Sequence, residues 1–433
     1  MLLHKEKIFD SIELSTVSTN KFKASVISFS MTLPLKRSST AYGLLISHLL
    51  CRGSESYPSI ALLNRRLDEL YGSYVEIKSH HIGENLSLTI SAETLDNKYI
   101  PDGTDVIGEL ISIIAELILS PAFLQPSFSA QVFEQEKRLI IDSINAEINN
   151  PRLYSAKKCL ELMQEDIALP TSDELKQIVS DIRYGDLCDY YRELISSAPL
   201  RVFCVSAENA ENLKRRIEAS FEGYPCKSPS LPIPLRPLKR NLPEHKKVSM
   251  PVSQGKLTLG FSTDIIIRSD DDTYYTMIML NEILGGSASS KLFLNVREKM
   301  GLCYYCSSSY SLYSGIMLIS SGFEMKNYEI AKEAILNQIE EIKNGNVSDF
   351  ELESAQRSVT SGYRQLYDSP FELQSFFLNR ALFNIADGID DAERKLLAVK
   401  KDDIVALAKK IRLDASFFIE GDADACEGES YCE

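Results

Sequence analysis

Two stretches of this 433-residue sequence show the same order of structural signals on either side of a proline-rich segment. Residues 62–72, LLNRRLDELYG, align with residues 291–301, KLFLNVREKMG, and each stretch ends in a glycine that turns the chain from a predicted helix into two predicted strands. Upstream, HLLCRGS at residues 48–54 matches NEILGGS at residues 281–287. Chance rarely produces so long a common order, so the sequence predicts a tandem duplication of one α+β unit.

The predicted duplication divides the chain into four parts. Residues 1–222 form the N-terminal half and residues 248–420 form the C-terminal half. Residues 223–247 contain six prolines and no periodicity, which predicts an extended and fairly stiff linker. Residues 421–433 form an acidic tail that we expect to be disordered. The alternative to a duplication is a pair of unrelated α+β domains.

Charge and hydropathy argue against two classes of partner. The chain has 47 Lys and Arg against 61 Asp and Glu, a net charge of −14, which argues against nucleic acid because phosphate contacts need clustered basic side chains. The most apolar segment, residues 106–119, carries Glu109 and Glu116 on a polar stripe at helical spacing, which predicts an amphipathic helix and no membrane span. Residues 1–15 lack an apolar core of signal-peptide length, and nine irregularly spaced cysteines fit reduced thiols, so we expect a cytoplasmic protein.

Two polar side chains stand out near the end of the second repeat. Arg297 and Tyr304 are seven residues apart and flank Gly301, where the chain turns from helix to strand. A guanidinium and a phenol both donate hydrogen bonds, so the pair is suited to binding a peptide carbonyl oxygen. The alternative is that Arg297 pairs with a neighbouring acid and Tyr304 packs in the core.

The two repeats together resemble the pitrilysin/insulinase family of zinc peptidases, over about residues 11–418. The resemblance implies an α+β fold of two homologous halves, each an antiparallel-rich sheet with helices packed on one side, that form a clamshell around a peptide. In that family the first half carries the zinc motif H-x-x-E-H and a further downstream Glu. The second half supplies an Arg and a Tyr to the substrate, and these match Arg297 and Tyr304.

The zinc motif is degenerate in this sequence. It falls on residues 44–48, where Leu44 has no lone pair to donate, Ser47 cannot act as a base near neutral pH, and only His48 is retained. The family's downstream Glu falls on Ser143. We therefore expect no catalytic residue, no metal ligand and no cofactor in this chain alone.

Two other arrangements of potential ligands are weaker. A lone His on an apolar helix is more often a hydrogen-bonded semi-buried residue than a ligand, and we expect no partner to converge on His48. A relocated metal site built from His48 with Asp142 or Glu147 is the alternative. Cys303 and Cys306 are expected to face opposite sides of a strand, which argues against zinc or redox chemistry there.

The family also includes two-subunit proteases in which one chain has the zinc motif and a homologous chain lacks it, and this sequence resembles the second type. The resemblance extends to zinc-less bacterial members whose name links them to modification of elongation factor P, a link that no residue of this sequence supports. It implies a non-catalytic, substrate-binding subunit whose partner is a homologous subunit with an intact H-x-x-E-H and bound zinc, and whose substrate is a peptide added to an exposed sheet edge. The alternative is a peptide-binding or scaffolding protein without any proteolytic partner.

Overall fold

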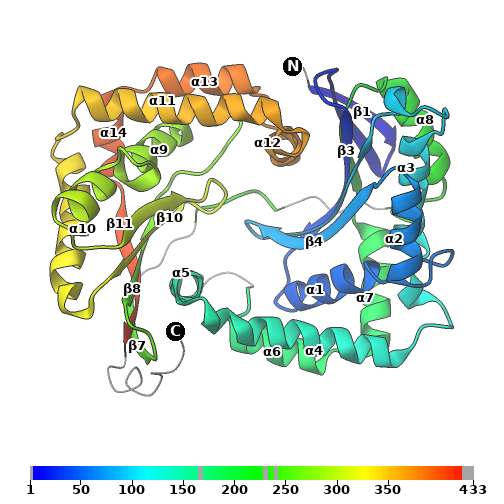
Figure 1. Cartoon of the computed structure of the whole chain (residues 1–433), viewed down its shortest axis with the longest axis horizontal. Helices are drawn as coiled ribbons and strands as arrows, with labels where there is room; N and C mark the ends of the chain where they lie inside the picture. Colours follow the sequence, from blue (N-terminus) through cyan, green and yellow to red (C-terminus); the bar gives the residue numbers. More distant parts are fainter. Residues whose placement is uncertain (1–2, 164–168, 228–232, 238–241, 422–433) are drawn as a thin grey trace. The chain divides into compact units, whose positions relative to one another are not determined.

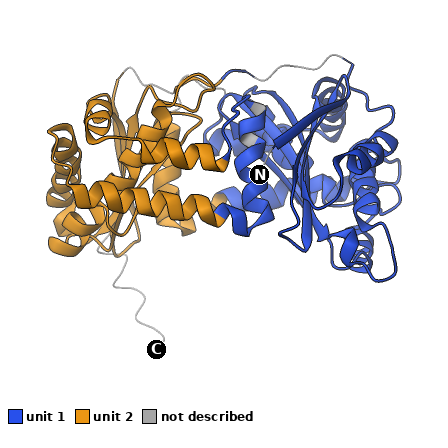
Figure 2. Cartoon of the chain, turned by 90° about the horizontal axis from the view of Figure 1, so that it is seen from above, with its two compact units in different colours: residues 1–144, 168–234, 366–388 blue, residues 145–167, 235–365, 389–433 orange. Residues whose placement is uncertain are grey.

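A computed structural model of the chain describes residues 3–163, 169–227, 233–237 and 242–421. The chain divides into two compact units, each built from segments that are separated in the sequence (Figure 2). Unit 1 consists of residues 1–144, 168–234 and 366–388, and unit 2 consists of residues 145–167, 235–365 and 389–433. Among the described residues, no helix is both long enough and apolar enough to span a membrane.

Unit 1 is organised around a six-stranded sheet (Figure 1). In spatial order the strands are β1 (Leu3–Phe9), β2 (Ile12–Ser18), β6 (Leu200–Ser206), β3 (Ala24–Pro34), β5 (Asn85–Leu95) and β4 (Tyr74–Ile82). Parallel pairing joins β2 to β6, and the other neighbouring strands pair antiparallel.

The five-stranded sheet of unit 2 repeats this order and these directions without a counterpart of β1. The order is β7 (Glu244–Met250), β11 (Arg412–Gly421), β8 (Gly255–Ser262), β10 (Ile316–Phe323) and β9 (Tyr305–Tyr310). Again one pair is parallel, β7 with β11, and the other pairs are antiparallel. The predicted α+β fold with two similar halves is therefore confirmed.

Amphipathic helices cover the sheets. The helix predicted from the most apolar segment is α3 (Val106–Leu119), whose N-terminus is capped by Asp105 through a 3.0 Å hydrogen bond from the Gly108 N–H, and its apolar side chains enter the core of unit 1. The other α-helices of unit 1 are α1 (Ser39–Leu50), α2 (Ile60–Glu69), α4 (Ala130–Ala146), α6 (Ser172–Asp181), α7 (Tyr184–Ser197), α8 (Ala210–Ser220) and α12 (Pro370–Leu382).

In unit 2 two segments are π-helical, Glu282–Gly286 and Leu292–Lys299. They lie within residues 281–301, the second copy of the stretches that are repeated in the sequence. The α-helices of this unit are α5 (Pro151–Met163), α9 (Thr273–Asn281), α10 (Tyr328–Lys343), α11 (Asp349–Gln365), α13 (Ile389–Leu397) and α14 (Lys401–Ala408).

Each sheet also has a helix on its other face, and that helix comes from the opposite half of the sequence. In unit 1, Phe203 of β6 stacks on Phe377 of α12 at 6.4 Å between ring centroids, while Val202 and Cys204 point into the core on the other side. In unit 2, Ser155 of α5 lies 2.9 Å from Thr258 of β8, joined through their hydroxyl groups. The sequence predicted contiguous halves and missed this exchange, because periodicity identifies a buried helix face without telling which sheet covers it.

The structure changes the predicted boundaries of the linker and of the tail. Glu244–Lys247 belong to β7, so the extended segment ends earlier than predicted. Within it, the Asn85 side chain donates to the Ile233 carbonyl at 2.8 Å and accepts from the Ile233 N–H at 2.7 Å, which fixes this part of the segment to unit 1. Of the predicted tail, Gly421 ends β11 and residues 422–433 lie outside the described residues.

Candidate functional site

The degenerate motif lies on α1, which is held in unit 1 by fully buried side chains such as Leu45 and Leu49. The Ser47 hydroxyl donates to the Leu44 carbonyl at 2.8 Å, and the Ser143 hydroxyl on α4 donates to the Ile140 carbonyl at 2.7 Å. Both hydroxyls are thus hydrogen-bonded within their own helices, as serines in helix interiors often are.

His48 has a partner that the sequence did not predict. Its Nδ1 atom lies 3.0 Å from Oε2 of Glu136 on α4, and Nε of Arg52 donates to Oε1 of the same carboxylate at 2.7 Å. Glu136 is only 3% exposed. The prediction that His48 is a hydrogen-bonded, semi-buried residue is confirmed, whereas the expectation that no partner converges on it is wrong. Glu136 lies seven residues before Ser143, two turns away on the same face of α4, and that spacing is the sequence signal that would have found it.

These residues do not fit a zinc ion. A structural or catalytic zinc site needs at least three protein donors, but residues 44, 47, 48 and 143 supply one imidazole, one leucine side chain and two serine hydroxyls. Within the described ranges, no group of three His, Cys, Asp or Glu side chains is placed to hold a metal ion. Glu147, the alternative ligand, belongs to unit 2 and forms an ion pair with Lys157.

Arg297 and Tyr304 lie in unit 2 on either side of Gly301, whose φ of +62° is the left-handed conformation that glycine adopts without strain. The helical segment that carries Arg297 is anchored by the fully buried side chains of Leu292 and Val296. Its last turn is closed by an i to i+5 hydrogen bond from the Met300 N–H, 3.0 Å from the Asn295 carbonyl oxygen. π-helical hydrogen bonding is rare and frequently occurs at functional sites.

Both side chains of the pair are accessible to solvent. The Arg297 guanidinium stacks 4.6 Å from the centroid of the Phe293 ring, and its Nε lies 3.5 Å from the Glu298 carboxylate, with 40% of the Arg297 side chain exposed. Tyr304 is 52% exposed, although its N–H is fixed by a 2.8 Å hydrogen bond to the Gly322 carbonyl. Arg297 therefore has the weak acidic partner that the alternative foresaw, but Tyr304 does not pack in the core.

Cys303 and Cys306 lie on the same side of the chain, contrary to the sequence prediction. β9 begins at Tyr305, so Cys303 precedes the strand and does not follow its alternation. The Ser321 hydroxyl donates to Sγ of Cys303 at 3.0 Å, and Cys306 stands directly opposite Ser321 in the β9–β10 ladder. Both thiols are buried, and a hydrogen bond from Cys306, opposed by burial, lowers the pKa of Cys303.

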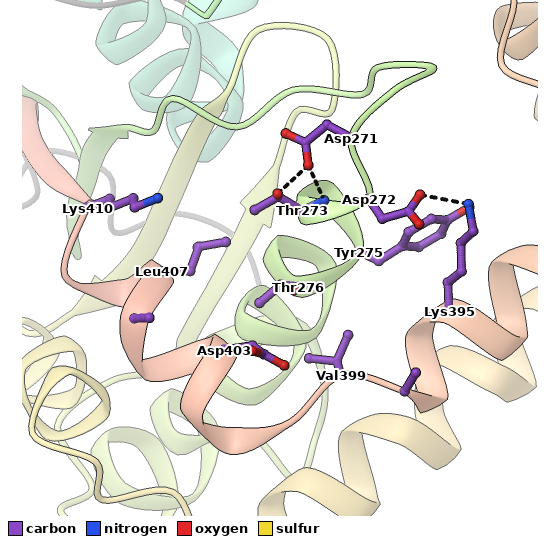
Figure 3. A pocket seen from close by; sticks show the side chains of 12 residues that line it. Asp271, Asp272, Thr273, Tyr275, Thr276, Lys395, Val399, Asp403, Leu407 and Lys410 are labelled. Carbon is purple, nitrogen blue, oxygen red and sulfur yellow. Dashed lines mark hydrogen bonds and ion pairs between the residues drawn. The ribbon is translucent and has the colours of Figure 1, made fainter.

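A hollow of about 480 Å³ in unit 2 contains neither Arg297 nor Tyr304 (Figure 3). It lies between α9, α13 and α14, and two carboxylates at its rim have partners within unit 2. The Asp271 carboxylate accepts from the Thr273 N–H at 2.8 Å, and Lys395 donates to Asp272 at 2.7 Å (Figure 3). Both carboxylates are therefore already bound by groups of unit 2.

The fold and these residues define a class of protein, a duplicated α+β peptidase fold in which two of the three metal-ligand positions, Leu44 and Ser143, carry side chains that cannot hold the metal. Residues 181–359 match the model of the peptidase M16 inactive domain. A probable inactive metalloprotease of Bacillus subtilis, YmfF, is 30% identical over 413 residues, covering 94% of this chain and 95% of the relative.

Solved structures agree with this assignment. A conserved protein from Enterococcus faecalis V583 superposes with a TM-score of 0.86 at 25% identity, covering 98% of this chain and 99% of that protein. A peptidase M16 inactive domain from Pseudomonas fluorescens has the same fold, with a TM-score of 0.79 at 15% identity and coverage of 97% and 98%. The chain belongs to the peptidase M16 family, as a non-catalytic member, and the resemblance to the pitrilysin/insulinase peptidases is confirmed.

Proposed function

We propose that this chain is the non-catalytic, substrate-binding subunit of a cytoplasmic two-chain zinc endopeptidase that acts on peptides. Arg297 and Tyr304 would contribute to an active site whose zinc and H-x-x-E-H motif are on a homologous partner chain. The observation that carries the proposal is the contrast within this chain. Two of its three metal-ligand positions (Leu44 and Ser143) and the general-base position (Ser47) are replaced, whereas Arg297 and Tyr304 are both present, fixed in their backbone and exposed.

The two side chains suit a peptide carbonyl. Arg297 has donors left after its contact with Glu298, because a guanidinium carries five N–H groups and, among the described residues, Nε alone is engaged, at 3.5 Å. Tyr304 adds one phenolic O–H donor. Two fixed donors that converge on an oxygen stabilise negative charge developing there without reorganising during the reaction. That role needs no metal ligand in this chain.

A sheet edge lies next to this pair. β9 is the last strand of its sheet and starts one residue after Tyr304, so its outer backbone groups have no neighbouring strand among the described residues. An extended peptide that pairs with β9 would gain main-chain hydrogen bonds whatever its sequence. This supports a subunit that binds peptides broadly and presents them close to Tyr304.

The proposal is tested by co-expressing the chain with a homologue that has an intact H-x-x-E-H and measuring cleavage of a quenched fluorescent peptide. Arg297→Ala and Tyr304→Phe should each lower kcat/KM by about 100-fold, the effect of removing one such donor. Arg357→Ala, an exposed arginine on α11, is the matched control and should leave the rate unchanged. Failure to form a complex, or equal rates for all variants, would contradict the proposal.

A further inference from the structure

Tyr305, Gly322 and Lys256 lie in one row across three neighbouring strands. Tyr305 of β9 is opposite Gly322 of β10, and Gly322 is opposite Lys256 of β8. Side chains in one such row project from the same face of the sheet. A Cβ atom at Gly322 would lie 2.4 Å from Cε1 of Tyr305, so the phenol ring lies across the glycine and extends from the edge strand toward β8.

Two cations meet at this ring. The Arg152 guanidinium carbon is 4.2 Å from the ring centroid, and Nζ of Lys256 is 5.5 Å from it. Arg152 is in the first turn of α5, which the contact between Ser155 and Thr258 holds on the same face of β8. We call Arg152, Lys256 and Tyr305 the cationic platform. All three residues belong to unit 2.

The cationic platform has no internal counter-ion. Lys256 donates to the Gln254 side-chain carbonyl at 2.8 Å, and neither Lys256 nor Arg152 pairs with a carboxylate in the part of the chain that the structure describes. Burial, together with the nearby Arg152 charge, lowers the pKa of Lys256. Two like charges side by side destabilise each other, and an anion bound between them would relieve that repulsion.

A carboxylate is the anion that fits this arrangement. Arg binds a carboxylate with two parallel N–H···O bonds, and Lys adds a third donor from a flexible stem. The phenol ring supplies a flat surface that holds the guanidinium in place. Because Tyr305 directly follows Tyr304, the platform lies at the start of the same edge strand along which a peptide would pair.

We propose that Arg152 and Lys256 form a subsite for a carboxylate of the bound peptide, either an acidic side chain or the peptide's C-terminus. The inference rests on the proposed function, since it requires that the chain binds peptides, and it adds a chemical preference. Although the acidic net charge of −14 by itself favours basic peptides, this site selects a negative group locally.

The test uses the full-length chain and one fluorescently labelled ten-residue peptide of Ala, Ser, Val and Leu in four forms. The forms carry Glu or Gln at the centre and a free or an amidated C-terminus, and binding is measured by fluorescence anisotropy at low salt. At least one of the two forms with a single carboxylate should bind about tenfold more tightly than the form with Gln and an amidated C-terminus, as expected for a charge-assisted hydrogen bond. Comparison of the two single-carboxylate forms shows whether the side chain or the terminus occupies the subsite.

Variants separate the subsite from the rest of the binding surface. The double variant Arg152→Gln, Lys256→Gln should bind the carboxylate-containing peptides no more tightly than the peptide with Gln and an amidated C-terminus. Its affinity for that neutral peptide should equal the affinity of the wild type. Lys332→Ala is the matched control, because this lysine also lies over a tyrosine ring of unit 2, at 5.7 Å from the Tyr328 centroid. Equal binding of all four forms by the wild type would overturn the carboxylate subsite and leave the proposed function standing. Binding of none of the four forms would overturn both.

Discussion

Nδ1 of His48 lies 3.0 Å from Oε2 of Glu136, a carboxylate that is only 3% exposed and that also accepts a hydrogen bond from Arg52. A buried carboxylate is stable only when its charge is matched by hydrogen-bond donors, and these two side chains supply them. The contact therefore holds α1 against α4 in unit 1. His48 therefore has a structural role in this chain, as a partner of the Glu136 carboxylate.

Replacing Glu136 tests that structural role. Glu136→Ala should lower the free energy of unfolding by about 1–3 kcal/mol, because it removes two charged hydrogen bonds and leaves Arg52 and His48 without their partner. The measurement is denaturant unfolding followed by circular dichroism. Glu134→Ala is the matched control on the same helix, since Glu134 is 59% exposed, and it should change stability by less than about 0.5 kcal/mol. Equal effects of the two variants would contradict the structural role of Glu136.

The ion pair between Lys291 and Glu351 should make unit 2 sensitive to acid. Nζ of Lys291 lies 2.8 Å from Oε1 of Glu351. Burial alone would raise the pKa of Glu351, but hydrogen bonds from Lys291 and Ser348 outweigh it and hold the pKa below its ordinary value of 4.5. A carboxyl group with a depressed folded-state pKa contributes stability above its unfolded pKa and loses it as the pH falls through the folded pKa.

Glu351→Gln should therefore destabilise the protein by about 1 kcal/mol at pH 7, where the wild-type ion pair is intact. The difference between variant and wild type should shrink as the pH falls below 4.5. Calorimetric melting of both proteins at several pH values checks this. A stability difference that stays constant down to pH 3, about one unit or more below the ordinary pKa, would contradict it.

The packing of α5 on its sheet depends on Gly260. A Cβ atom there would lie 2.3 Å from the Met163 sulfur and 3.1 Å from the Cys159 sulfur, so Gly260→Ala should push α5 away from β8 and cost about 1–3 kcal/mol. At Gly362 in α11 an added Cβ meets nothing within 4 Å. Gly362→Ala should instead stabilise the protein by about 0.5–1 kcal/mol. Thermal melting in which the two variants shift the melting temperature in the same direction would contradict both expectations.

The sequence predicted the elements whose signals are local. The helix over residues 106–119 follows from apolar spacing, and Asp105 caps it as its residue type favours. The exchange of α5 and α12 between the units was not predictable, because a helix pattern does not name the sheet on which it packs. β1 was missed because it is an edge strand with few buried side chains, which weakens the alternation that identifies strands.

At the candidate site, the sequence identified which side chains are present but not their contacts. The positions of Leu44, Ser47 and Ser143 were enough to predict that a zinc site is incomplete. Glu136 was missed because its contact with His48 joins two helices 88 residues apart in the chain. The Cys303 prediction failed because it placed both cysteines in one strand, whereas β9 begins at Tyr305 and contains only Cys306.

The proposed function requires that this chain holds no zinc and still presents Arg297 and Tyr304 to a peptide. The most direct test is the zinc content of the purified full-length chain, measured by mass spectrometry after incubation with zinc and removal of the excess. A variant with Leu44→His, Ser47→Glu and Ser143→Glu restores the family's ligand types and serves as the positive comparison. The wild type should hold no stoichiometric zinc and the variant about one zinc per chain. Stoichiometric zinc in the wild-type protein would contradict the account.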